Sequence, residues 1–114
     1  MKSLKQYVAL TEKVRLYVPS TINVNEVFDN KIAVKRIEQL FSSEFGGATT
    51  YETSGSYMTD SNILVKEQIT IVEAFTDELT NENIDFVLNI AEGLRDDLVQ
   101  DCISLEINNK LYFI

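Results

Sequence analysis

Residues 12–19, with the sequence EKVRLYVP, alternate polar and apolar side chains over almost their whole length. Successive residues of an extended chain point to opposite faces, so one side of this segment is apolar and the other carries Arg15 and Tyr17. Pro19 has no backbone N–H for a further ladder bond and ends the pattern. The segment therefore predicts a strand with one buried face. The apolar side chains of that face are Val14, Leu16 and Val18.

A helix is predicted next, after an ordered loop at residues 20–28. Asp29 or Asn30 is suited to the N-cap position, and the pair Gly46-Gly47 is suited to the left-handed C-cap conformation. Apolar residues between these caps recur at three- and four-residue spacing, as on one face of a helix. The positions expected to be buried are Ile32 or Ala33, Ile37, Leu40 and Phe41.

Two further strands are predicted at residues 48–57 and 63–75, joined into a hairpin by a turn at 60–62. Gly55 marks a candidate bulge. Glu67 and Glu73 are expected near strand ends, facing water. Alternation along the second of these strands assigns Ile63, Val65, Ile69, Ile71 and Phe75 to the buried face. The opposite, open face then receives Lys66, Gln68 and Thr70.

A second helix is predicted at residues 80–98, with Thr80 as its N-cap and Glu82 in the first turn, near the positive end of the helix dipole. Gly93 inside it suggests a close contact with a neighbouring element. A last strand follows at 102–107, with Ser104 and Glu106 on the open face, and a turn leads into the terminal 111–114. The apolar face of the helix consists of Ile84, Val87, Leu88, Ala91, Leu94 and Leu98.

The predicted order is strand, helix, strand, strand, helix, strand, which is the split βαβ arrangement of ferredoxin-like sandwiches. We therefore expect an α+β fold in which an antiparallel sheet of four to five strands carries two helices on one face. Residues 1–114 are expected to form a single domain, with residues 1–11 as an N-terminal arm. The other face of the sheet is left open or covered by a partner.

Composition argues against several kinds of chemistry. The chain has 114 residues, a net charge of −8, no histidine and one cysteine, Cys102. Without histidine there is no ordinary general base near neutral pH and no zinc shell of nitrogen and sulfur, so we predict no catalytic residue, no metal and no cofactor. The acidic surface disfavours nucleic acid as a partner. No segment resembles a membrane span or a secretion signal, so a cytoplasmic protein is expected.

The negative charge is concentrated in one part of the chain. Between Glu67 and Asn109 there are eleven acidic residues and one basic residue, Arg95. Five of the acids recur at helical spacing, and we call them the acid stripe. Its members are Glu78, Glu82, Asp85, Glu92 and Asp96. Such a row is either the solvated face of an amphipathic helix or a coarse imitation of a phosphate track that meets a basic protein surface.

Several segments together resemble a small family of uncharacterised single-domain proteins from bacteria, phages and other mobile elements. They are residues 14–21 (VRLYVPST), 23–26 (NVNE), 45–49 (FGGAT), 65–67 (VKE) and 103–107 (ISLEI). The resemblance implies the sandwich fold but no established activity. The association with mobile elements favours an inhibitor that acts by contact.

The main hypothesis from the sequence is thus a non-enzymatic acidic protein whose acid stripe occupies a basic groove, such as that of a host defence nuclease. Two alternatives remain open. One is a small-molecule or nucleotide-binding domain, or a small enzyme, in which the loop 20–29 and the open sheet face bind an anionic ligand through Arg15, Tyr17 and Lys66. The other is a homodimer that pairs open sheet faces or edges.

Overall fold

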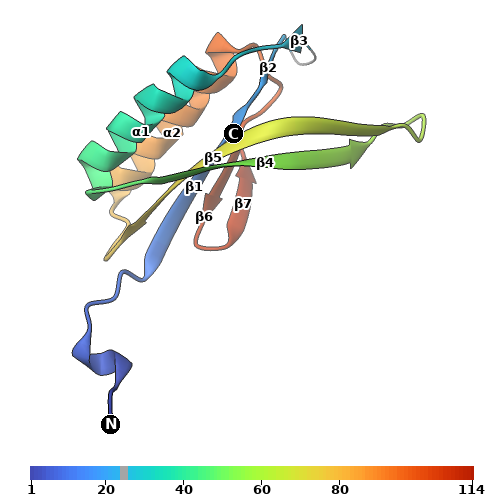
Figure 1. The fold of residues 1–114 in the computed structure, drawn as a ribbon. Helices are drawn as coiled ribbons and strands as arrows, with labels where there is room; N and C mark the ends of the chain where they lie inside the picture. The colour runs from blue at the N-terminus through green and yellow to red at the C-terminus, as the bar shows by residue number, and fades with distance from the viewer. Residues whose placement is uncertain (24–25) are drawn as a thin grey trace.

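A computed structural model describes residues 1–23 and 26–114, and in that part of the chain two α-helices lie side by side on one face of a five-stranded sheet (Figure 1). The sheet is formed by β1 (Glu12–Pro19), β4 (Thr49–Met58), β5 (Leu64–Thr76), β6 (Ser104–Ile107) and β7 (Lys110–Phe113). The helices are α1 (Lys31–Phe45) and α2 (Asn81–Asp97). A short 3-10 turn (Leu4–Gln6) and a two-stranded ribbon of β2 (Thr21–Ile22) and β3 (Glu26–Val27) complete the described elements.

All neighbouring strands of the large sheet are antiparallel, in the order β4-β5-β1-β6-β7. The first strand of the chain is therefore central, between β5 and β6. This confirms the α+β fold and the ferredoxin-like arrangement that the sequence predicts. The loop expected at 20–28 contains the β2–β3 ribbon, and its residues 24–25 lie outside the described part of the chain.

Alternation along β1 places its apolar side chains in the core, as predicted. Val14, Leu16 and Val18 are almost completely buried. The two partners of Leu16, Val72 on β5 and Leu105 on β6, are also fully buried. Burial of such side chains contributes roughly 1.5–3 kcal/mol each relative to exposure. The hydrophobic effect therefore fixes which face of β1 meets the helices.

Helix α1 has Asn30 at its N-cap and Gly46 at its C-cap, where the glycine adopts a φ of 89°. The Asn30 amide does not cap the helix. It donates instead to the backbone oxygens of Val18 and Pro19 and to the hydroxyl of Thr70, which ties the helix start to the sheet. The buried residues of α1 are Val34, Ile37 and Phe41, while Ala33 and Leu40 are partly buried and Ile32 is exposed.

Strand β5 has the opposite phase to the one predicted. Antiparallel partners share a face, and the pairing of Leu16 with Val72 places Thr70, Val72 and Ala74 toward the helices. Glu73 therefore lies on the open face, and Lys66 lies on the other. The prediction failed because residues 69–72 (ITIV) are apolar or small on both faces, so alternation in this segment has no unique phase.

The structure contradicts the expectations of a bulge at Gly55 and of a close contact at Gly93. Gly55 forms no bulge, because β4 and β5 pair without interruption from Thr49 to Met58. A Cβ atom at Gly55 would lie 2.6 Å from Cδ1 of Ile69, so the small residue allows this side chain to pack across the hairpin. Gly93 in α2 is exposed, and a Cβ atom there would have no neighbour within 4 Å.

Helix α2 begins with a capping box. The hydroxyl of Thr80 accepts from the backbone N–H of Asn83 at 3.1 Å, and the Asn83 side chain accepts from the backbone N–H of Thr80 at 2.9 Å. The helix buries its predicted face through Val87, Ala91, Leu94 and the following Leu98. No helix in the described ranges is long and apolar enough to cross a membrane.

The capping box provides a test of the helix boundary. Thr80→Ala removes the acceptor for the N–H of Asn83 and should lower the free energy of unfolding by about 1 kcal/mol. Thr80→Ser keeps a hydroxyl at the same place and should lose only a small part of that stability. Urea unfolding of both variants measures the difference, and equal stability of Thr80→Ala and wild type would show that this cap does not form.

Candidate functional site

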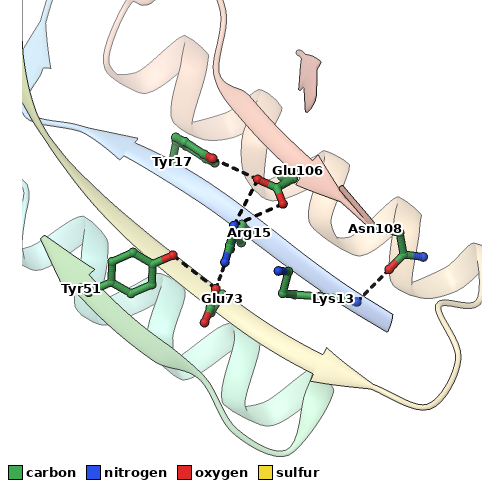
Figure 2. A network of polar contacts seen from close by, with 7 residues as sticks. All are labelled: Lys13, Arg15, Tyr17, Tyr51, Glu73, Glu106 and Asn108. Atoms are coloured by element: carbon green, nitrogen blue, oxygen red, sulfur yellow. Dashed lines mark hydrogen bonds and ion pairs between the residues drawn. The ribbon is translucent and has the colours of Figure 1, made fainter. Parts of the chain in front are cut away.

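The open face of the sheet carries a group of polar side chains that touch one another across four strands (Figure 2). We call this group the Arg15 cluster. Arg15 and Tyr17 come from β1, Glu73 and Glu106 come from the two strands beside it, β5 and β6, and Tyr51 comes from β4. The cluster consists of Arg15, Tyr17, Tyr51, Glu73 and Glu106.

Strand register brings the charged members together. Arg15 on the central strand is the direct partner of Glu73 on β5 and of Glu106 on β6. Its Nε atom donates to Oε2 of Glu73 at 2.6 Å, and its Nη1 atom donates to Oε2 of Glu106 at 3.3 Å. One guanidinium is therefore held between two carboxylates, and the charged groups sum to −1.

Two tyrosines complete these contacts. The hydroxyl of Tyr17 donates to Oε1 of Glu106 at 3.1 Å, and that of Tyr51 on β4 donates to Oε2 of Glu73 at 3.4 Å. Each carboxylate thus receives the guanidinium and one phenol. The side chains of both glutamates are 13% exposed and that of Arg15 is 29% exposed. The cluster is therefore partly shielded from water but reachable from the open face.

The surroundings shift the protonation equilibria of three members. The hydrogen bond to Glu73 raises the pKa of the Arg15 guanidinium above its already high usual value, so this side chain stays charged. Burial, followed by the hydrogen bond to Glu106, raises the pKa of Tyr17. Burial, followed by the negative charge of Glu73, raises the pKa of Tyr51. Both phenols therefore remain neutral hydrogen-bond donors at physiological pH.

A small cavity of about 90 Å³ adjoins the cluster on the open face, and Tyr17 belongs to both. We call it the Tyr17 cavity. It lies where the end of β1 and the first half of β5 meet the segment before β6. Its lining residues are Tyr17, Pro19, Glu67, Ile69, Gln100, Cys102, Ile103 and Ser104.

A larger hollow of about 440 Å³ lies between α1 and the strands β4 and β5, where Thr70 and Glu38 line it. It is bigger than the Tyr17 cavity, but it contains neither the guanidinium nor the two paired carboxylates. Tyr51 borders it, while the hydroxyl of Tyr51 bonds to Glu73 in the cluster. The concentration of interacting polar groups therefore marks the open face as the candidate site.

The structure brings together only two of the three residues predicted to bind a ligand. Arg15 and Tyr17 lie two positions apart on one face of β1, as expected. Lys66 is separated from them, because it lies on the opposite face of β5 in the outer part of the hairpin. A binding role for Arg15 and Tyr17 stays a prediction, but the proposed grouping with Lys66 is wrong.

The acid stripe is exposed, as the sequence predicts for a polar helix face. Glu82, Asp85 and Glu92 lie within α2, whereas Glu78 precedes the helix. Asp96 accepts from Nε of Arg95 at 3.0 Å. Among the described residues no group of three or more acidic or cysteine side chains is arranged to hold a metal ion.

The sequence predicts that Glu73 faces water near a strand end, and the structure corrects this expectation. Its side chain is mostly buried and accepts from Arg15. Tyr51 was expected, with Tyr57 as the alternative, only near the edge of the open face, and its hydroxyl in fact bonds to Glu73. The signal that identifies both residues is the cross-strand register, which depends on the phase of β5 and is ambiguous in the sequence.

No family model matches the chain, and no curated protein matches it. The structure is similar to a phage SAM lyase in complex with S-methyl-5'-thioadenosine, with a TM-score of 0.68 and 20% identity over 98% of this chain and 95% of the other. It is also similar to a phage SAM lyase in the apo state, with a TM-score of 0.62 and 18% identity over 90% of this chain and 87% of the other.

These similarities correct two expectations from the sequence. The chain resembles a phage enzyme rather than a family without established activity, so that resemblance was wrong. The hypothesis of a non-enzymatic protein that presents an acidic helix to a host nuclease is likewise contradicted, because the structural relatives are enzymes that act on a small molecule. The findings favour the alternative of a small-molecule-binding domain or a small enzyme.

Alkaline unfolding tests the geometry of the cluster. The folded state raises the pKa of Tyr17 and Tyr51, so below about pH 10 both phenols are neutral in the folded and in the unfolded protein. Above about pH 10 they ionise first in the unfolded protein, and the free energy of unfolding therefore falls as the pH rises through the folded-state pKa. The double variant Tyr17→Phe and Tyr51→Phe should therefore lose less stability than wild type between about pH 8 and about pH 11. Urea unfolding midpoints of both proteins at both pH values measure this difference. Equal losses of stability in wild type and the double variant would contradict the contacts that Tyr17 and Tyr51 make in the cluster.

Proposed function

We propose that this protein binds S-adenosylmethionine (SAM) at the Arg15 cluster and cleaves it as a lyase. The observation that carries the proposal is the net charge of −1 in a partly shielded cluster on the open sheet face. The similarity to phage SAM lyases over nearly the whole chain supports the substrate. We place the activity in the cytoplasm.

The cluster has the chemistry that a sulfonium ion requires. SAM carries a fixed positive charge on sulfur, and Glu73 and Glu106 supply two carboxylates against the single guanidinium of Arg15. The rings of Tyr17 and Tyr51 lie beside these carboxylates, and aromatic faces attract cations that lack hydrogen-bond donors. Partial burial strengthens both attractions, because fewer water molecules screen the charges.

The reaction breaks the bond between the sulfur and Cγ of the amino-acid chain. Sulfur keeps the electron pair and becomes the neutral thioether of S-methyl-5'-thioadenosine. The electrons for Cγ come from the carboxylate of the substrate itself, which closes on Cγ and forms a lactone. Atoms and charge balance without water and without a proton transfer.

This route suits the residues that are present. The chain has no histidine, and both cluster carboxylates already accept bonds from Arg15 and a tyrosine, so no free base stands in the cluster. Closure of the lactone within the substrate does not require a base. It needs the reacting atoms held close together in a shielded site, where the opposite charges of carboxylate and sulfonium attract more strongly and then neutralise each other.

The direct test is to incubate the purified protein with SAM and to measure S-methyl-5'-thioadenosine and the four-carbon product by chromatography. We expect both products in equal amounts. Glu73→Gln and Glu106→Gln each remove one charge that faces the sulfonium, and each should lower kcat/KM by about tenfold or more. The loss should fall mainly on KM, because the charge that these groups recognise is present in the bound substrate.

Glu92→Gln is the matched control, because it makes the same change of charge on the exposed face of α2, away from the cluster. Its kcat/KM should equal that of wild type. Absence of S-methyl-5'-thioadenosine with the wild-type protein would overturn the proposal. Equal losses in all three variants would contradict the assignment of the site, because net charge alone would then explain them.

A further inference from the structure

The Tyr17 cavity lies beside the Arg15 cluster, but no residue of the cavity other than Tyr17 takes part in the contacts described for the cluster. Tyr17 connects the two, because it lines the cavity while its hydroxyl bonds to Glu106. A ligand whose positive centre sits at the cluster can therefore extend a substituent along the open face into the Tyr17 cavity.

The size of the cavity limits what can enter it. Its volume of about 90 Å³ is well below the roughly 300–1,000 Å³ typical of pockets for drug-sized ligands. A purine nucleoside does not fit such a space, but several water molecules or a short polar chain do. Of the two large substituents on the sulfur of SAM, the amino-acid chain is the one that matches.

The polar groups that line the cavity favour a cation. Glu67 contributes a carboxylate that forms no ion pair or hydrogen bond with any described residue, and the lining contains no lysine or arginine. Gln100 uses its Nε2 atom to donate to the backbone oxygens of Thr21 and Leu98, which leaves its Oε1 atom as an acceptor. A primary ammonium group, which has three donors and no acceptor, complements this set.

The distance between the cavity and the cluster also matches the length of the amino-acid chain of SAM. Ser104 in the cavity and Glu106 in the cluster lie two positions apart on the same face of β6, which corresponds to about 6–7 Å. This is the scale of the three-carbon chain that separates the sulfur of SAM from its amino nitrogen. The hydroxyl of Ser104 is a donor that suits the substrate carboxylate, which lies next to the amino group.

We propose that the Tyr17 cavity binds the amino-acid end of the substrate and that Glu67 is the specificity-determining residue that accepts its ammonium group. This inference rests on the proposed function, because it assumes a sulfonium substrate at the Arg15 cluster. The residue that selects the substrate therefore lies outside the Arg15 cluster. Adenosyl sulfonium compounds without an amino group bind weakly. The product that lacks the amino-acid chain does not contact Glu67.

Binding calorimetry with two ligands tests this without turnover. One ligand is sinefungin, a stable SAM analogue that keeps the amino-acid end and bears an amine in place of the sulfonium. The other is S-methyl-5'-thioadenosine, which lacks that end. Glu67→Gln should weaken sinefungin binding about tenfold or more and change the affinity for S-methyl-5'-thioadenosine by less than about twofold. Glu67→Asp keeps the charge and should recover part of the sinefungin affinity.

Glu52→Gln is the matched control. Glu52 lies on β4, is exposed and lines the larger hollow beside α1 rather than the Tyr17 cavity, so the change of charge is the same at a different place. It should bind both ligands as wild type does. If wild type binds both ligands and Glu67→Gln binds sinefungin equally well, the inference is wrong while the proposed function stands. If wild type binds neither ligand, the proposed function fails and the inference falls with it.

Discussion

The pairing of β1 with a strand on each side is the constraint on which the rest of the structure depends. Its apolar residues Val14, Leu16 and Val18 are buried against the helices, so Arg15 and Tyr17 have to point to the open face. Because β5 and β6 both run antiparallel to β1, each offers a residue directly opposite Arg15. Both of those residues are glutamates. A hydrophobic pattern in one strand thus fixes the position of the charged group at the centre of the site.

This arrangement makes the cluster a preorganised unit. The guanidinium separates two carboxylates that would otherwise repel each other across the central strand, and each tyrosine adds a hydrogen bond to one of them. Breaking a partly buried ion pair from one side leaves an uncompensated charge, which is more costly than the pair itself is stabilising. The cluster therefore keeps its geometry without a ligand and presents one surplus negative charge, so a cation meets a site that needs little rearrangement.

Much of the fold could be predicted because several segments carry signals with one physical meaning. Alternation in β1, the glycine at the end of α1 and the threonine at the start of α2 each correspond to the observed element. The phase of β5 could not be predicted in the same way. Ile71 and Val72 are both buried although they point to opposite faces, so the apolar pattern near the middle of this strand contains no information on phase.

The candidate site was predicted less well for a related reason. Its contacts join residues 58 and 91 positions apart, and no spacing rule connects them until the register is known. The acid stripe was conspicuous in the sequence because its members are close along the chain. These acids, which are close in the sequence, lie on an exposed helix face. The partly buried charges of the Arg15 cluster are far apart in the sequence and lie on three neighbouring strands.

The central claim is that the Arg15 cluster binds a sulfonium-type cation on the open sheet face. Its most direct test is a nuclear magnetic resonance titration of the labelled protein with sinefungin. The account predicts that the Nε–H signal of Arg15 and the ring signals of Tyr17 shift with a single saturating dependence on ligand, while the methyl signals of Val34 and Thr70 beside α1 do not. Shifts confined to Val34 and Thr70, or no shifts at a saturating concentration, would contradict it.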